Sequence, residues 1–274
     1  MTIPARQPHR APASPKRPED HRPEGGGPSD VSGPRLPSNI ARAWLVHLYT
    51  ASGALAAFFG TVAVFEARYR DSLLFMMFAT CVDATDGLLA RRARVTEVLQ
   101  TFDGARLDDI VDYLTFVFLP VLFMYHGALM PYGWDWLVAS VVLLSSAYGF
   151  GSTDAKTSDH FFTGFPSYWN IVALYLYVAD LSPGVNAMIV LVLSGLVFVR
   201  IGYVYPSRTP VWRTATVVAG VVWGAFLLTI ILALPERRTG LLALSLAYPV
   251  YYIVLSLTLQ LRRAPLAIAK APPA

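Results

Sequence analysis

Long apolar runs recur along this chain after a polar start, and they constrain its fold more than any other feature. Hydropathy marks eight runs, at about residues 44–65, 72–91, 107–126, 133–151, 167–182, 184–204, 212–233 and 239–261. A helix needs about 20 apolar residues to cross a bilayer, and in lipid only helices or closed barrels satisfy their own backbone. With 55% hydrophobic residues, the 274-residue chain is more apolar than a soluble domain. We therefore predict an all-α protein, a polytopic membrane bundle of about eight transmembrane helices.

Some of these runs carry features that predict local breaks in the helices. Pro120 lies in the third run and Pro249 in the eighth. Proline lacks the N–H that an interior helical residue donates, so each one predicts a kink that can widen a pocket. The fifth run is short and polar at its start, as is typical of a segment that lines a cavity.

The two ends of the chain differ from the apolar middle. Residues 1–37 are rich in Pro, Arg and Gly and hold almost no large apolar side chain, so we expect a disordered cytoplasmic tail without a signal peptide. Residues 39–47 combine apolar side chains with an arginine and predict a short interfacial helix. The membrane domain is then expected at residues 38–263, followed by a cytoplasmic C-terminal tail at residues 264–274.

Lysine and arginine are spread unevenly over the segments between the runs, and this predicts the orientation. With the amino terminus inside, the cytoplasmic segments hold Arg35, Arg42, Arg91, Arg92, Arg94, Arg106, Lys156, Arg200, Arg208, Arg213, Arg262, Arg263 and Lys270, and the outer segments hold Arg68, Arg70, Arg237 and Arg238. By the positive-inside rule, both termini are cytoplasmic. The net charge of +4 therefore favours anionic lipid as a partner, and no nucleic acid is expected. The single cysteine, Cys81, implies no oxidising compartment.

Four aspartates lie where two consecutive apolar runs approach the cytoplasmic side: Asp83 and Asp86 in one, Asp108 and Asp112 in the next. A carboxylate facing lipid would be unfavourable by roughly 2.5–3.5 kcal/mol on insertion scales, so each needs compensation. Residues three or four apart share one face of a helix, so each pair points in one direction. Two opposed faces of this kind suit a hard divalent cation that takes oxygen ligands. Asp109 lies about 100° away from Asp108 and is left out.

The acids belong to a longer pattern, DxxDGxxAR, twelve residues, then GxxxDxxxD. Its matches are Asp83, Asp86, Gly87, Ala90, Arg91, Gly104, Asp108 and Asp112. The pattern resembles the signature of the CDP-alcohol phosphotransferase family, although most of that family has a shorter gap. The longer gap, residues 159–170 and the HLYTASGA stretch resemble the bacterial phosphatidylcholine synthase branch. The resemblance covers roughly residues 40–262.

The resemblance implies an enzyme, a site and a location. The reaction would transfer the phosphatidyl group of CDP-diacylglycerol to choline, giving phosphatidylcholine and CMP. Mn²⁺ or Mg²⁺, as two ions, would be held by Asp83, Asp86, Asp108 and Asp112, with Asp112 also acting as general base. The nucleotide would contact Asp83, Gly87, Ala90, Arg91 and Gly104. A homodimer in the bacterial inner membrane is expected by the same analogy, and the Lys and Arg count above places the active site on the cytoplasmic side.

Two further residue groups are candidates for substrate contacts. Choline carries a fixed positive charge that aromatic faces bind well, and Phe165, Tyr168 and Trp169 crowd one junction near Asp159. Three arginines between the sixth and seventh runs, Arg200, Arg208 and Arg213, are candidates for lipid phosphate. An interfacial aromatic belt and ordinary positive-inside charge explain the same residues without a ligand.

Other functions remain open at this point. A cation or proton carrier would use the intramembrane acids without releasing CMP, and a structural membrane protein would do neither. The glycines and the Ala-Arg pair between the acids favour the enzyme, because a carrier does not require them. An aspartate-rich prenyltransferase usually has its acidic motifs far apart in the chain. Within the family, serine, inositol phosphate and glycerol phosphate are alternative acceptors.

Overall fold

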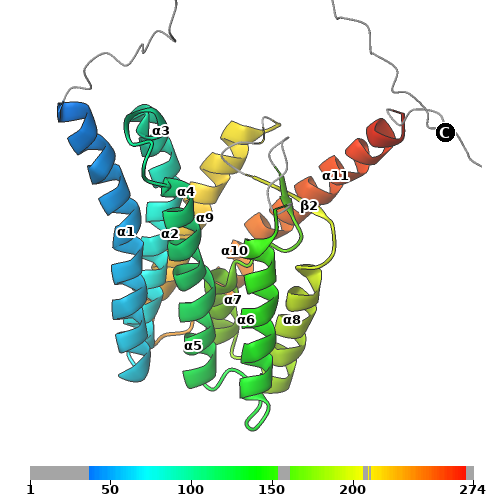
Figure 1. Cartoon of the computed structure of the whole chain (residues 1–274). Coiled ribbons are helices and arrows are strands. Elements are labelled where there is room, and N and C mark those ends of the chain that lie inside the picture. The colour runs from blue at the N-terminus through cyan, green and yellow to red at the C-terminus, as the bar shows by residue number, and fades with distance from the viewer. Residues whose placement is uncertain (1–36, 154–160, 206–208, 210, 270–274) are drawn as a thin grey trace, which may run out of the picture. The chain divides into compact units, whose positions relative to one another are not determined.

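The computed structural model of the chain describes residues 37–153, 161–205, 209 and 211–269. The elements are α1 (Pro37–Phe65), α2 (Tyr69–Arg92), α3 (Val95–Val98), α4 (Gly104–Asp112), the π-helix η1 (Tyr113–Phe118), α5 (Leu119–His126), α6 (Asp135–Gly151), β1 (Phe161–Thr163), α7 (Trp169–Ala179), α8 (Pro183–Leu196), β2 (Gly202–Val204), α9 (Arg213–Ala233), α10 (Thr239–Ser245) and α11 (Ala247–Ala269) (Figure 1). The predicted helical class is confirmed for the described residues.

Several of these helices are suited to a bilayer. Within the described residues, four helical stretches are long and apolar enough to cross a membrane: Ser38–Phe65, Tyr69–Arg92, Arg213–Ala233 and Thr239–Arg262. Three shorter apolar helices, α6, α7 and α8, stand beside them. Many large apolar side chains on their outer faces are exposed, among them Phe58, Leu144 and Val221. Exposed apolar surface of this kind is what a helix presents to lipid.

The first helix differs from its prediction. The expected interfacial helix at residues 39–47 is wrong as a separate element, because α1 continues without a break from Pro37 to Phe65. Proline suits the first turn of a helix, where no intrahelical partner exists for its missing N–H. No proline follows within α1, so no residue of this kind interrupts the helix before the apolar run.

A short antiparallel ribbon interrupts the helical pattern. Strand β1 pairs with β2, with Phe161 opposite Val204 and Thr163 opposite Gly202. Helix α8 ends at Leu196, so β2 occupies the end of the sixth predicted run. The ribbon packs on α11 through Phe161, Val204 and Leu259. Valine and aromatic side chains fit a half-buried strand as well as a helix, so hydropathy did not separate the two.

Helix α1 packs along α2 and crosses α4, η1 and α5. Glycines on α1 allow the close crossing, since a Cβ on Gly53 would lie only 2.5 Å from Cγ1 of Val111 in α4. A Cβ on Gly60 would likewise lie 2.6 Å from a methyl group of Leu119 in α5. The backbone of α1 therefore approaches the third run directly, and this approach brings α1 to the acidic residues.

The third predicted run forms one continuous helical rod whose winding changes in the middle. Asp103 accepts a hydrogen bond from the backbone N–H of Arg106 and caps α4. The π-helix η1 begins directly after Asp112, and Pro120 is the second residue of α5. A π-helical segment thus precedes Pro120, a feature that often marks functional sites, and a kink at Pro120 itself stays a prediction. In the eighth run the break falls at Leu246, close to the position where the ring of Pro249 excludes a regular turn.

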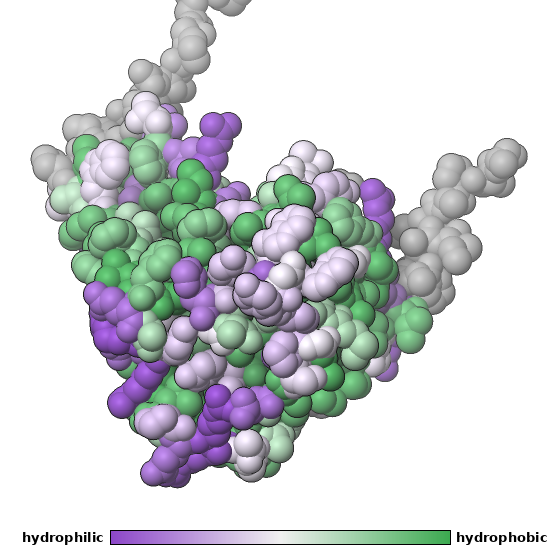
Figure 2. Space-filling model, turned by 90° about the horizontal axis from the view of Figure 1, so that it is seen from below, coloured by the Kyte–Doolittle hydropathy of each residue, from purple (hydrophilic) through white to green (hydrophobic). Residues whose placement is uncertain are grey.

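The loops that join α1 to α2 and α9 to α10 carry paired charges. Arg68 bonds to Glu66 at 2.6 Å and to Asp71 at 2.5 Å, and Arg237 pairs with Asp180. Figure 2 views this end of the helices and shows hydrophilic clusters among apolar side chains. Arginines at this end are therefore largely balanced by acids.

Candidate functional site

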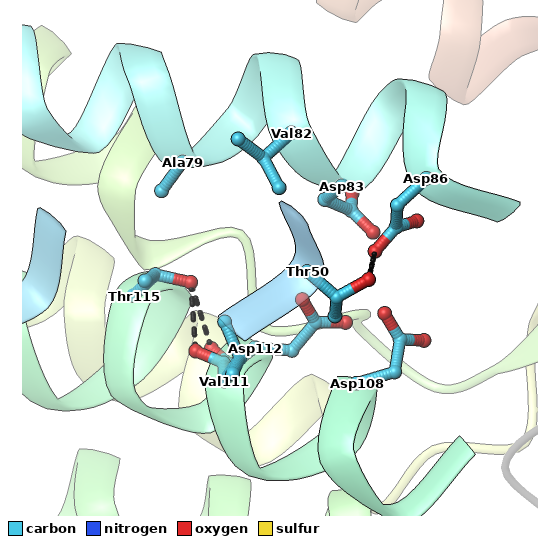
Figure 3. Close-up of a pocket in the computed structure, with 9 residues that line it drawn as sticks. All are labelled: Thr50, Ala79, Val82, Asp83, Asp86, Asp108, Val111, Asp112 and Thr115. Carbon is cyan, nitrogen blue, oxygen red and sulfur yellow. Dashed lines mark hydrogen bonds between the residues drawn. The ribbon is translucent and has the colours of Figure 1, made fainter. Parts of the chain in front are cut away.

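The four predicted acids converge on one small pocket. Asp83 and Asp86 come from α2, and Asp108 and Asp112 come from α4 (Figure 3). The remaining lining is Thr50, Ala79, Val82, Val111 and Thr115. Small and medium side chains thus separate the carboxylates, and the two helices present their acids to each other as the spacing predicted.

Three of the acids form a tight cluster. One carboxylate oxygen each from Asp83, Asp108 and Asp112 lies within 4.8 Å of the others, and Asp83 is the most exposed of the three. An all-oxygen donor set is what Mg²⁺, Mn²⁺ and other hard cations prefer. The cluster therefore fits a divalent cation.

Asp86 stands apart from this cluster and has its own partner. Its Oδ2 accepts a hydrogen bond of 2.8 Å from Oγ1 of Thr50 in α1. Thr50 is 7% exposed and Asp86 is 6% exposed, so the bond lies away from water. A neighbouring hydrogen bond joins Tyr49 to Thr85 at 2.8 Å. Helix α1 is thus part of the site, which the sequence pattern alone did not indicate.

The glycines predicted near the nucleotide have different surroundings. A Cβ on Gly87 would meet only the guanidinium of Arg91, at 3.3 Å, so this side of α2 is open. A Cβ on Gly104 would lie 2.5 Å from the imidazole of His47 in α1. Gly104 therefore serves the packing of α1 on α4, in addition to any role toward a substrate. Ala90 and Arg91 follow on α2, and Arg91 is exposed.

The predicted aromatic cluster divides into two parts. Trp169 is fully buried, its indole N–H donates to Ser146 at 2.8 Å, and Phe165 packs edge-on against it. Tyr168 has different surroundings: its ring centroid lies 6.3 Å from that of Phe116 in η1, and it is not among the residues that line the acidic pocket. The three predicted aromatics therefore do not form one cluster around the acids. Asp159 lies outside the described residues.

The candidate lipid-phosphate arginines lie away from the pocket lining. Arg200 is exposed between α8 and β2, and Arg213 is exposed at the start of α9, where it lines a surface hollow with Trp212 and Thr214. Arg208 lies outside the described residues. The structure therefore does not bring Arg200 and Arg213 into the acidic pocket.

Sequence reasoning missed two residues near the site. Thr50 and His47 lie on α1, more than thirty residues before the first acid. The HLYTASGA stretch that holds them indicated a family branch but no contact with the acids. The spacing of His47, Thr50 and Gly53, three residues apart, is the one signal that would have placed them on a common face.

Helices of membrane-spanning length present two pairs of aspartates to one pocket, an arrangement that suits a membrane enzyme using a divalent cation. No family model matches the chain, but several curated proteins are similar to it in sequence. The chain is 38% identical over 217 residues to the phosphatidylcholine synthase of Pseudomonas aeruginosa, covering 79% of this chain and 91% of the relative.

Further relatives agree with that match. The phosphatidylcholine synthase of Legionella pneumophila is 36% identical over 221 residues, covering 78% of this chain and 87% of the relative. That of Rhizobium johnstonii is 36% identical over 191 residues, covering 70% and 79%. The chain belongs to the phosphatidylcholine synthase family. The predicted family and enzyme class are confirmed, and the chain is a multi-pass membrane protein.

Proposed function

We propose that the membrane domain, residues 38–263, transfers the phosphatidyl group of CDP-diacylglycerol to choline. The choline oxygen attacks the phosphorus that bears the diacylglycerol, the bond from that phosphorus to CMP breaks, and phosphatidylcholine and CMP leave. The observation that carries this proposal is the convergence of four acids on one pocket in a chain of this family.

The four acids are assigned to metal binding. Asp83, Asp86, Asp108 and Asp112 would hold Mn²⁺ or Mg²⁺, as two ions by analogy with the family. When bound, such cations neutralise diphosphate oxygens and stabilise charge that develops in the displacement. The clustered oxygens of Asp83, Asp108 and Asp112 support this assignment.

Asp112 is assigned a second role as general base. It accepts the proton of the choline hydroxyl as the new P–O bond forms, and a positioned base of this kind contributes about 10²–10⁴-fold. Its place in the pocket, at the end of α4 where the helix changes to η1, supports the assignment.

The two substrates would approach the acids from different elements. Asp83, Gly87, Ala90, Arg91 and Gly104 are assigned to the nucleotide, and the open face of Gly87 beside Arg91 supports a backbone approach there. Choline is assigned to Tyr168 and Asp159, while Phe165 and the fully buried Trp169 support that region through core packing. The contact of Tyr168 with Phe116 in η1, the segment that follows Asp112, supports this order. Arg200, Arg208 and Arg213 are assigned to lipid phosphate.

Location and topology complete the proposal. We assign eight crossings of the bacterial inner membrane, cytoplasmic termini and an active site that faces the cytoplasm. The paired arginines at the α1–α2 and α9–α10 loops support that orientation, because they leave the net positive charge at the opposite end. A homodimer stays a prediction of the family resemblance.

Purified protein with CDP-diacylglycerol and Mn²⁺ tests the reaction. Choline, serine, inositol phosphate and glycerol phosphate are offered separately, and CMP and the lipid product are measured. We expect phosphatidylcholine and CMP in equal amounts with choline alone. Product formation with serine but not with choline would overturn the acceptor, and CMP formation with no acceptor-dependent lipid would overturn the transfer.

A further inference from the structure

The contact between Thr50 and Asp86 joins two elements that the signature does not connect. Oγ1 of Thr50 donates to Oδ2 of Asp86 at 2.8 Å, and both residues line the acidic pocket. The donor comes from α1, whereas all four acids come from α2 and α4 (Figure 3). A hydroxyl that donates to a buried carboxylate restricts the orientation of that carboxylate.

The position of Thr50 is fixed by close packing on both sides. His47, Thr50 and Gly53 lie three residues apart on one face of α1. His47 packs over Gly104, and Gly53 receives Val111, so the backbones of α1 and α4 approach closely above and below Thr50. The hydroxyl of Thr50 therefore reaches Asp86 from a helix that has little freedom to move.

Asp86 needs such a partner more than the other acids do. It lies outside the cluster of Asp83, Asp108 and Asp112 and is the most buried of the four. With Oδ2 engaged by Thr50, Oδ1 is the oxygen that can turn to a cation. Carboxylate ligands are commonly oriented in this way by a hydrogen bond from a second residue.

We propose that Thr50 is a positioning residue that orients Asp86 as a metal ligand, so that α1 forms a third wall of the active site. The inference rests on the proposed function only in taking the acids as a metal site. It adds a residue from the first helix, and it gives Asp86 a hydrogen-bond partner that lies outside α2 and α4.

Thr50→Val removes the hydroxyl and keeps the size of the side chain, and Thr50→Ser keeps the hydroxyl. Thr61→Val is a matched control, because Thr61 on the same helix donates to the backbone carbonyl of Ala57 and not to an acid. Mn²⁺ binding is titrated by electron paramagnetic resonance in detergent without substrate, and the thermal midpoint Tm is followed by tryptophan fluorescence. Thr50→Ala is measured alongside in case Thr50→Val does not fold.

We expect Thr50→Val to raise the Kd for Mn²⁺ by about 10–100-fold, with Thr50→Ser and Thr61→Val within about threefold of wild type. Wild-type Mn²⁺ affinity in Thr50→Val or Thr50→Ala overturns the proposal even if Tm falls, because the bond is then structural. The proposal is also overturned if Thr50→Val and Thr50→Ala both fail to fold while Thr50→Ser folds. It is overturned as well if the wild-type protein binds no Mn²⁺. Wild-type protein that binds Mn²⁺ but transfers nothing to choline would remove the proposed function and leave the role of Thr50 intact.

Discussion

The indole N–H of Trp169 donates a hydrogen bond of 2.8 Å to the hydroxyl of Ser146, and both side chains are fully buried. Tyr168, the preceding residue, lies instead against Phe116 of η1, the segment that follows Asp112. Two neighbouring aromatics that looked equivalent in the sequence therefore have different roles available to them. Trp169 stabilises the core, and Tyr168 is the residue that we propose to contact choline.

Tyr168→Leu is expected to weaken choline use. Losing the cation–π contact with a desolvated cation should weaken binding by about 2 kcal/mol, which raises the KM for choline roughly thirtyfold. The KM for CDP-diacylglycerol should change much less. Steady-state kinetics with each substrate varied in turn measures both constants. Tyr168→Phe keeps the ring and should retain most of the choline affinity.

Trp169→Phe is the matched variant in the core. It removes the donor to Ser146 and should lower the free energy of unfolding by about 0.5–1.5 kcal/mol, since the buried Ser146 hydroxyl loses one of its two donors and keeps Ser167. The choline KM should stay near wild type. A large rise in choline KM for Trp169→Phe, with none for Tyr168→Leu, would reverse the assignment of the two residues.

Asp112→Asn tests the general base. Asparagine keeps the shape and one oxygen but accepts no proton, so we expect kcat to fall by at least about a hundredfold. Binding of CDP-diacylglycerol with Mn²⁺ should fall much less, which equilibrium binding in detergent measures. Asp109→Asn is the control on the adjoining face of α4 and should keep kcat within about threefold. Near-normal turnover in Asp112→Asn would show that Asp112 is not the general base.

Fusions of a reporter after Arg70 and after Arg106 test the orientation. Helix α2 separates the two positions, so they should report opposite sides of the membrane, with Arg106 in the cytoplasm. Alkaline phosphatase activity and green fluorescence distinguish the two sides. If both fusions report the same side, α2 does not span, and the cytoplasmic site loses its basis.

The sequence predicted the acids well because their spacing is local. Asp83 and Asp86 share a face by helical geometry, as do Asp108 and Asp112, and two consecutive helices then need only pack together to oppose them. The short connection between the two helices makes this packing predictable from the sequence. The convergence of the four aspartates could therefore be predicted from their spacing.

Contacts between distant segments were not predictable in the same way. Thr50 and Asp86 are 36 residues apart, and no local period links a threonine in α1 to an acid in α2. The π-helix η1, which follows Asp112, is not marked by a recognisable residue pattern. Burial of Trp169 was equally hidden, because an aromatic side chain at a helix start suits a membrane interface and a core alike.

Gly53→Ala tests whether the close approach of α1 to α4 supports the site. The added methyl group would lie 2.5 Å from Cγ1 of Val111, so α1 or Val111 has to move. Overpacking of this kind destabilises by about 1–3 kcal/mol, which a lower Tm in detergent reports. Because Thr50 lies one turn away on the same face, the shift should also raise the Kd for Mn²⁺.

Two further variants make that test specific. Val111→Ala removes the clashing methyl group, so the double variant with Gly53→Ala should recover Tm and Mn²⁺ affinity, with a coupling of about 0.5–3 kcal/mol in a double-mutant cycle. Gly224→Ala in α9 is the control, because no atom lies within 4 Å of its added Cβ, and it should leave both values unchanged. If Gly53→Ala leaves Tm and Mn²⁺ affinity unchanged, as expected for Gly224→Ala, then the contact between α1 and α4 accommodates an added methyl group. The geometry of Thr50 and Asp86 would then not depend on that close contact.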